Sequence, residues 1–216
     1  MTRGPIWRAV GLAALFLSVL GCGDDNNNTG STKNAPLFEF NAQQNGGRTV
    51  RWANLPIRVF LGDGVARADE VNVWSPVTGG AVTFAFLPTA AGANVTFRFR
   101  SGSDICGVTF LEFTDDGEMT SADVQVSQSI YRGPQCVRTV THETAHAIGF
   151  LGHTDDGGLM DPDGGNGDVT SLVSGVLRDL YHFSPGTVVT AQAKRLGLQR
   201  SGGKNVMTFV YYPVRR

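Results

Sequence analysis

Residues 139–162 read TVTHETAHAIGFLGHTDDGGLMDP and hold three of the four histidines in the chain. His142 and His146 are spaced i, i+4, so a helix brings both imidazoles to one face, within reach of a single metal ion. Glu143 lies beside them and can act as a base. The HExxH pattern therefore predicts a helical zinc site, and the competing interpretation is a solvated helix with two surface histidines.

His153 is the candidate third ligand. It follows His146 by seven residues, which an unbroken helix would place about 10 Å further along its axis. Zinc–imidazole bonds are only about 2.0–2.1 Å long, so the chain must turn before His153. Gly149 lies where that turn is needed, because glycine adopts the left-handed conformation that ends helices. Alternative oxygen ligands are Asp155, Asp156 and Asp161.

Leu159-Met160-Asp161-Pro162 follows the third histidine. Together with the histidines, it resembles the matrixin-like group of the metzincin metallopeptidases, whose signature is HExxHxxGxxH followed by a methionine-containing turn. This chain has one extra residue between Gly149 and His153, which a loop bulge can absorb. Pro162, where another branch of the family has tyrosine, favours the matrixin-like group.

The resemblance implies a zinc-dependent endopeptidase of α+β fold, with a twisted mixed sheet, packed helices, an active-site helix, a methionine turn and a C-terminal helix. Its implied catalytic base is Glu143, its metal ligands are His142, His146 and His153, and Met160 forms the base beneath the metal. The implied partner is a protein or peptide substrate that pairs in extended form with an edge strand, expected at residues 107–113.

Two other classes of function stay open. One is a surface binding module that keeps zinc for structure, although structural sites usually close with a fourth protein ligand, and no fourth is apparent. The other is a catalytically degenerate zinc-binding envelope lipoprotein, in which the extra residue misplaces His153.

The N-terminal residues 1–22 are expected to be a signal peptide. Arg3 and Arg8 precede an apolar run over residues 9–20, which is too short to span a bilayer. The run ends Val19-Leu20-Gly21-Cys22, which looks like a bacterial lipobox, so we expect Cys22 to be lipidated and to anchor the protein to a membrane of the cell envelope. A conventional secretory signal is the alternative. Residues 23–35, GDDNNNTGSTKNA, lack large apolar side chains and predict a flexible tether.

Cysteine usage agrees with export. If Cys22 carries lipid, Cys106 and Cys136 remain, and in an oxidising compartment they most simply form one disulfide. A cysteine that ligates zinc in a precursor is the disfavoured alternative.

Residues 36–187 are expected to form the catalytic domain. Alternating apolar residues predict strands near residues 57–61, 82–86, 95–99, 108–113 and 124–126. Apolar stripes predict a helix over residues 65–74 and a later one that begins after Asp168 or Thr170. The zinc helix is expected to bury one face and to turn its histidines toward metal and solvent. Residues 188–216 are assigned as an extension of unknown role, with a strand-like NVMTFVYYPV.

Composition narrows the remaining classes. A chain of 216 residues with formal net charge −1 predicts one ordinary globular domain, expected to be a monomer, and gives no basic excess for nucleic-acid binding.

A glycine-rich loop offers possible calcium ligands at Asp161, Asp163, Asn166 and Asp168. These residues lack the EF-hand pattern and its closing glutamate, so a plain turn is favoured over a calcium site.

Overall fold

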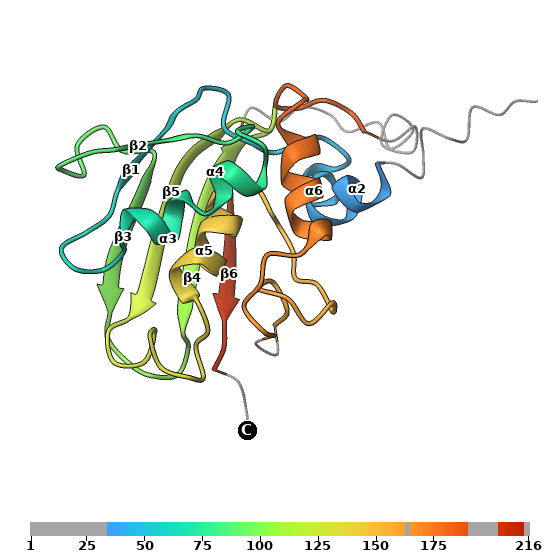
Figure 1. Ribbon diagram of the computed structural model, residues 1–216. Helices are drawn as coiled ribbons and strands as arrows, with labels where there is room; N and C mark the ends of the chain where they lie inside the picture. Colours follow the sequence, from blue (N-terminus) through green and yellow to red (C-terminus); the bar gives the residue numbers. More distant parts are fainter. Residues whose placement is uncertain (1–33, 163–164, 190–202, 214–216) are drawn as a thin grey trace, which may run out of the picture.

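In the part of the chain that the structure describes, a mixed sheet of six strands forms the centre (Figure 1). The computed structural model describes residues 34–162, 165–189 and 203–213. The sheet order is β2-β1-β3-β5-β4-β6, in which β4 runs antiparallel to β5 and β6 and the other neighbours are parallel. The strands are β1 (Ile57–Phe60), β2 (Phe84–Phe86), β3 (Val95–Arg100), β4 (Gly107–Thr114), β5 (Met119–Ser127) and β6 (Lys204–Tyr211). The protein is therefore of mixed α/β class, compatible with the expected α+β class.

Short helices pack around this sheet. They are α2 (Ala35–Phe40), the 3-10 helix η1 (Ala42–Asn45), α3 (Ala68–Asn72), α4 (Trp74–Val77), α5 (Thr139–Ala147) and α6 (Ser171–Leu180). Figure 1 shows α3, α4 and α5 on the same side of the sheet, while α2 and α6 pack together beside it.

The predicted strands are confirmed at all five places, with boundaries shifted by a few residues. From Thr109 onward in β4, the side chains that face α5 are buried, whereas Phe110, Glu112 and Thr114 on the other face are only partly buried. This alternation is the period of two that the sequence displays, and it aims one face of β4 at the helix that carries the histidines.

The single helix predicted over residues 65–74 is wrong. The chain instead forms α3 and α4, which are separated at Val73, and Pro76 lies inside α4 rather than closing the helix. Proline is tolerated there because the first turn of a helix has no intrahelical acceptors for its N–H groups. The apolar stripe was still informative, since Val65, Val71 and Trp74 are all buried.

Helix α5 is buried along its whole length, so the expectation that its histidines face solvent is wrong. Two indole groups hold it near both ends. Trp74 Nε1 donates to the Thr141 carbonyl oxygen at 3.0 Å, and Trp52 Nε1 donates to the Ala147 carbonyl oxygen at 2.8 Å. Core side chains thus surround the helix and fix its position against the sheet.

The second predicted helix is confirmed as α6. Thr170 is its N-cap, and its hydroxyl oxygen accepts a hydrogen bond from the Val173 N–H. The predicted stripe is buried on its inner face at Val173, Val176, Leu177 and Leu180.

Strand β6 corrects one further expectation. Residues 107–113 are not a free edge, because β6 pairs with β4 from Gly107↔Tyr211 to Thr114↔Lys204. The strand-like segment of the C-terminal extension is therefore a strand, and it belongs to the same sheet as the predicted catalytic domain. Among the strands of the described ranges, β2 and β6 are the edges of the sheet.

The predicted disulfide is present. Cys106, just before β4, is bonded to Cys136, which lies three residues before α5. Both cysteines are buried and form a small second apolar cluster with Tyr211 of β6. The bond thus ties the start of β4 to the segment that leads into the metal helix.

Replacing both cysteines by alanine should lower the free energy of unfolding by about 3–4 kcal/mol, the chain-entropy value for a loop on the order of 30 residues. Urea unfolding followed by circular dichroism measures this loss, and the reduced wild-type protein serves as the matched control. A loss below about 1 kcal/mol would show that the disulfide contributes little to the fold.

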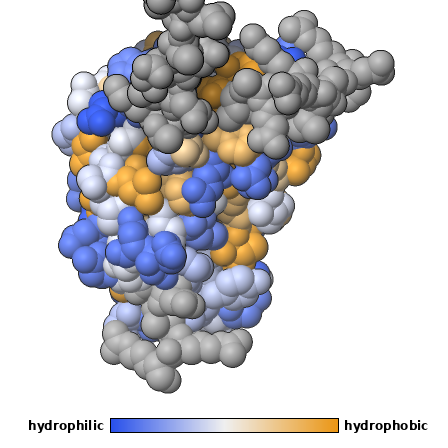
Figure 2. All heavy atoms as spheres, turned by 90° about the vertical axis from the view of Figure 1, so that its right-hand side faces the viewer, coloured by the Kyte–Doolittle hydropathy of each residue, from blue (hydrophilic) through white to orange (hydrophobic). Residues whose placement is uncertain are grey.

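Several expectations lie outside the described residues. They are the signal peptide, the lipidated Cys22, nearly all of the tether, and Asp163. Within the described ranges, no helix is both long and apolar enough to cross a bilayer. The face seen in Figure 2 mixes hydrophilic and hydrophobic side chains, without a broad hydrophobic area among the coloured residues.

Candidate metal centre

Three histidines converge from α5 and the loop that follows it. His142, His146 and His153 offer ligand nitrogens that all lie within 4.8 Å of one another. The Nε2 atom of His142 is 3.3 Å from the Nε2 of His146 and 3.3 Å from the Nε2 of His153. Among the described residues, this is the one group of three or more His, Cys, Asp or Glu side chains placed to share a metal ion.

The turn that delivers His153 depends on Gly149. Helix α5 ends at Ala147, and Gly149 has φ +109°, in the region that L side chains rarely adopt. A Cβ atom there would lie 2.7 Å from Leu180 Cδ2 and 3.0 Å from the Val50 carbonyl oxygen. The extra residue before His153 is accommodated in this turn, and His153 reaches the other two rings.

Backbone carbonyls orient two of the rings. His142 Nδ1 lies 2.7 Å from the Leu159 carbonyl oxygen, and His146 Nδ1 lies 2.7 Å from the Phe150 carbonyl oxygen. Because a carbonyl can only accept, each Nδ1 carries the proton, and each neutral ring turns the lone pair of Nε2 toward the other. Two nitrogen lone pairs 3.3 Å apart repel each other unless a cation lies between them. The arrangement of the Nε2 atoms therefore fits a metal ion.

Burial keeps these imidazoles neutral. It lowers the pKa of His142 to about 3, with the neighbouring His153 as a second cause, and it lowers the pKa of His146 well below its ordinary value. The pKa of His153 is also lowered by burial, against the opposing charge of Asp161. Neutral imidazole is the form that binds metal.

Glu143 is fully buried next to His142. Its Oε2 accepts a 2.6 Å hydrogen bond from the hydroxyl of Thr109 on β4, whereas its Oε1 has no hydrogen-bond partner among the described residues. Burial raises the pKa of Glu143 to about 8, and the Thr109 hydrogen bond opposes that rise. A buried carboxyl oxygen without a partner is costly and indicates a polar group, such as water, that belongs beside it.

Two residues of β4 shape the space around Glu143. One is Thr109, and the other is Gly107, where an added Cβ would lie 2.7 Å from Glu143 Oε1. Sequence reasoning missed both, because their role depends on the pairing of distant segments. The G-V-T start of β4 gives no local signal of a site.

The faces of two metal-centre imidazoles are covered by β6. The ring of Tyr211 stacks on His142 with centroids 4.1 Å apart, and the ring of Phe209 stacks on His146 at 4.4 Å. His142 and His146 have 0% exposed surface, to which this stacking contributes, and His153 is partly exposed. Neither aromatic residue was among the predicted site residues.

Met160 is fully buried in the main core. Its carbonyl oxygen accepts a hydrogen bond from the backbone N–H of Thr154, which is the residue after His153. The loop therefore folds back so that Met160 and His153 are held on neighbouring segments. The remaining histidine, His182, is exposed and lies outside the histidine group.

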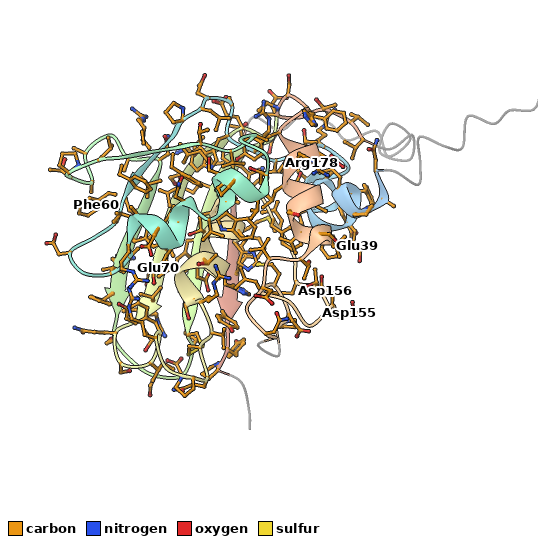
Figure 3. All side chains as sticks on the ribbon, in the orientation of Figure 1. Glu39, Phe60, Glu70, Asp155, Asp156 and Arg178 are labelled. Carbon is orange, nitrogen blue, oxygen red and sulfur yellow. A yellow bond between two sulfur atoms is a disulfide. The ribbon has the colours of Figure 1, made fainter. Side chains whose placement is uncertain are left out.

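The acidic loop residues do not join the histidines. Asp156 accepts hydrogen bonds from Thr154 Oγ1, Thr170 Oγ1 and the Gly158 N–H, so it ties the loop to the start of α6 (Figure 3). Asp161 Oδ2 accepts from the Gly157 N–H, and the Asn166 side chain accepts from the Asp168 N–H. These are bonds of a turn, and no calcium-type cluster occurs among the loop residues that the structure describes.

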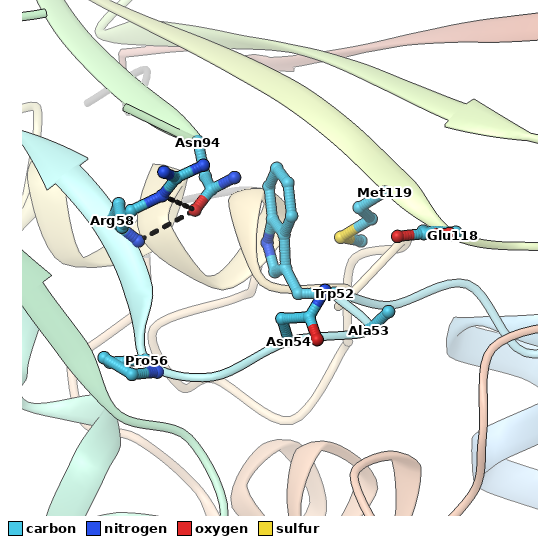
Figure 4. Close-up of a pocket in the computed structure, with 8 residues that line it drawn as sticks. All are labelled: Trp52, Ala53, Asn54, Pro56, Arg58, Asn94, Glu118 and Met119. Atoms are coloured by element: carbon cyan, nitrogen blue, oxygen red, sulfur yellow. Dashed lines mark hydrogen bonds between the residues drawn. The ribbon is translucent and has the colours of Figure 1, made fainter. Parts of the chain in front are cut away.

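A separate hollow of about 310 Å³ lies near the start of β1 (Figure 4). Trp52, Arg58, Asn94 and Met119 contribute to its wall, and Asn94 Oδ1 accepts from the Arg58 backbone and guanidinium N–H groups. None of the predicted site residues lines this hollow.

Comparison with known proteins adds no assignment: no protein-family model matches the chain, and no curated protein matches it. The functional argument therefore rests on the residues and geometry of the metal centre.

Proposed function

We propose that the protein is a zinc-dependent endopeptidase that resembles the matrixin-like metzincins. The observation that carries the proposal is the convergence of three neutral imidazoles beside a buried glutamate, one of whose oxygens has no hydrogen-bond partner in the described ranges. A closed structural zinc site has four protein ligands, whereas a catalytic site has three and keeps one position for water or substrate. Three histidines match the catalytic kind.

Zinc fits two of the three spacings between the ligand nitrogens, and the third is within 4.8 Å. Two nitrogens that each lie about 2.0–2.1 Å from one tetrahedral zinc ion are about 3.3 Å apart. The Nε2 atoms of His142 and His146 are separated by 3.3 Å, as are those of His142 and His153. His142, His146 and His153 would hold the ion, and the carbonyls of Leu159 and Phe150 would keep two of the rings oriented.

When bound, zinc supplies a Lewis acid that lowers the pKa of water toward about 7 and polarises a carbonyl. A cation held by the adjacent histidines would favour the ionised form of Glu143, against the effect of burial. That carboxylate would accept a proton from the attacking water as the new C–O bond forms, and it would pass the proton to the leaving amine as the peptide C–N bond breaks. Thr109 holds the other carboxyl oxygen in place, so that Oε1 stays free for this transfer. Met160 is proposed to form the base of the centre, as in the family that the sequence resembles.

The proposal extends to location and partners. We propose a bacterial lipoprotein of the cell envelope, anchored through Cys22, with secretion as the alternative. The disulfide between Cys106 and Cys136 supports an oxidising compartment. The substrate is a protein or peptide, the protein acts as a monomer, and nucleic acid is not a partner.

One observation favours a second candidate function, a zinc-binding module without turnover. His142, Glu143 and His146 are entirely buried, as in a site that holds metal only for structure. The two functions differ in whether any peptide bond is cleaved when zinc is present.

A quenched peptide library and casein test the proposal. The purified chain is assayed with one equivalent of zinc and with excess chelator, and fragments are identified by mass spectrometry. Because β6 covers the centre, the Phe209→Ala/Tyr211→Ala variant is assayed in parallel. The proposal expects zinc-dependent fragments from at least one form. Zinc binding without fragments from either form would support the binding module instead.

A further inference from the structure

Strand β6 lies where the proposed substrate has to bind. In the register of the sheet, Tyr211 is opposite Gly107 and Phe209 is opposite Thr109. These are the two β4 residues that adjoin the carboxyl group of Glu143. An extended peptide that reaches Glu143 along β4 would need the backbone positions that β6 already occupies.

The side chains of β6 also fill the space against the histidines. Phe209 and Tyr211 are two residues apart, so both point to one face of the strand, and their rings stack on His146 and His142 with interplanar angles of 11° and 10°. Tyr211 is further held by the apolar cluster around the disulfide, and its carbonyl oxygen accepts from the Cys106 N–H at 2.7 Å. The pair forms the cover of the metal centre.

A covered centre of this kind cannot hydrolyse a protein. His142, His146 and Glu143 have no exposed surface while β6 is in place, and hydrolysis requires access for both water and an extended chain. If the proposed function holds, β6 must leave β4 before a substrate binds.

The attachment of β6 is suited to such a release. Among the described strands, it is the last at one edge of the sheet and pairs on one side only, whereas β3 and β5 each pair on both sides. Of its eight residues, only Phe209 and Tyr211 are buried, and Val206 is 63% exposed. Edge elements with few buried contacts open at lower free energy than central strands.

We propose that β6 is an internal peptide ligand, which occupies the substrate-binding edge of β4 and keeps the metal centre closed. The inference rests on the proposed function and adds two statements to it. The intact chain is self-inhibited, and the open centre binds extended peptides with aromatic side chains at alternate positions, as in Phe209 and Tyr211.

Hydrogen–deuterium exchange on the intact chain tests the release directly. The amides of residues 204–211 should exchange through a local opening, at least about 100-fold faster than the slowest amides of β3 and β5. If β6 amides exchange only together with those of β3 and β5, β6 is a permanent strand of the fold and the proposal is overturned.

A binding measurement tests the ligand role. The labelled peptide of residues 204–213 is titrated into the intact chain, the Phe209→Ala/Tyr211→Ala variant, and the Tyr212→Ala control, which removes an aromatic ring that is 59% exposed. Fluorescence anisotropy should show at least tenfold tighter binding to the double variant than to the intact chain or the control. A peptide with alanine at both aromatic positions should lose that gain.

A folded double variant that does not take up the peptide would overturn the proposal, and circular dichroism establishes whether it is folded. If the variant takes up the peptide but no form cleaves any substrate, the ligand role of β6 stands and the proposed peptidase function fails. If the double variant cleaves peptides at least tenfold faster than the intact chain, and the Tyr212→Ala chain does not, both stand.

Discussion

In the Phe209→Ala/Tyr211→Ala background, which lacks the cover of the metal centre, Glu143→Ala should abolish peptide hydrolysis while zinc remains bound. The carboxyl group is the only buried acid beside the histidines among the described residues, and its Oε1 has no hydrogen-bond partner there. Loss of a general base costs about 10²–10⁴-fold in rate. The three imidazoles are unchanged by the substitution, so inductively coupled plasma mass spectrometry should still find one zinc per chain.

Glu39→Ala is the matched control, because Glu39 is an exposed glutamate on α2, away from the histidines (Figure 3). Made in the same background, it should leave both hydrolysis and zinc content at the level of the Phe209→Ala/Tyr211→Ala chain. Glu143→Gln, which keeps the shape and the Thr109 contact but cannot accept a proton in the same way, should be as inactive as the alanine variant. Full activity in either Glu143 variant would refute the assigned base.

His153→Ala should weaken zinc binding by at least about 100-fold, since even loss of a group that only supports a ligand typically costs 10–100-fold. His153 is the one ligand that the loop, rather than α5, supplies. Its Nε2 lies 3.3 Å from that of His142. Without it, two imidazoles remain and the site loses its third donor.

Competition with a coloured zinc chelator measures this affinity, and His182→Ala serves as the matched histidine control. His182 is exposed and outside the histidine group, so its loss should not change the affinity. If His153→Ala binds zinc as tightly as the wild-type protein, the extra residue after Gly149 has removed His153 from the site. The alternative of a catalytically degenerate zinc-binding protein is then correct.

Local sequence patterns were sufficient for much of the fold. The period-two alternations predicted the strands, and Thr170 with its apolar stripe predicted α6, because both signals come from residues close together in the chain. Gly149 predicted the end of α5 for the same reason. The apolar stripe over residues 65–74 did not reveal the break between α3 and α4, because one helix or two can bury the same apolar side chains.

Long-range packing could not be read from the sequence. Helix periodicity separates the faces of α5 but does not say what covers each face, so the full burial of His142 and His146 was unexpected. The pairing of β6 with β4 joins residues about a hundred positions apart in the chain. For that reason no sequence pattern identified four residues around the metal centre, namely Gly107, Thr109, Phe209 and Tyr211.

A zinc titration tests most directly the central claim that one zinc ion held by three histidines drives peptide hydrolysis. The chelator-stripped intact chain and the Phe209→Ala/Tyr211→Ala variant receive increasing zinc, and hydrolysis of a quenched peptide is followed together with bound metal. Activity of the double variant should rise in proportion to zinc and stop rising at one equivalent per chain, and the intact chain should bind the same zinc with lower activity. Hydrolysis that persists without metal, or zinc that binds without hydrolysis in either form, would contradict the claim.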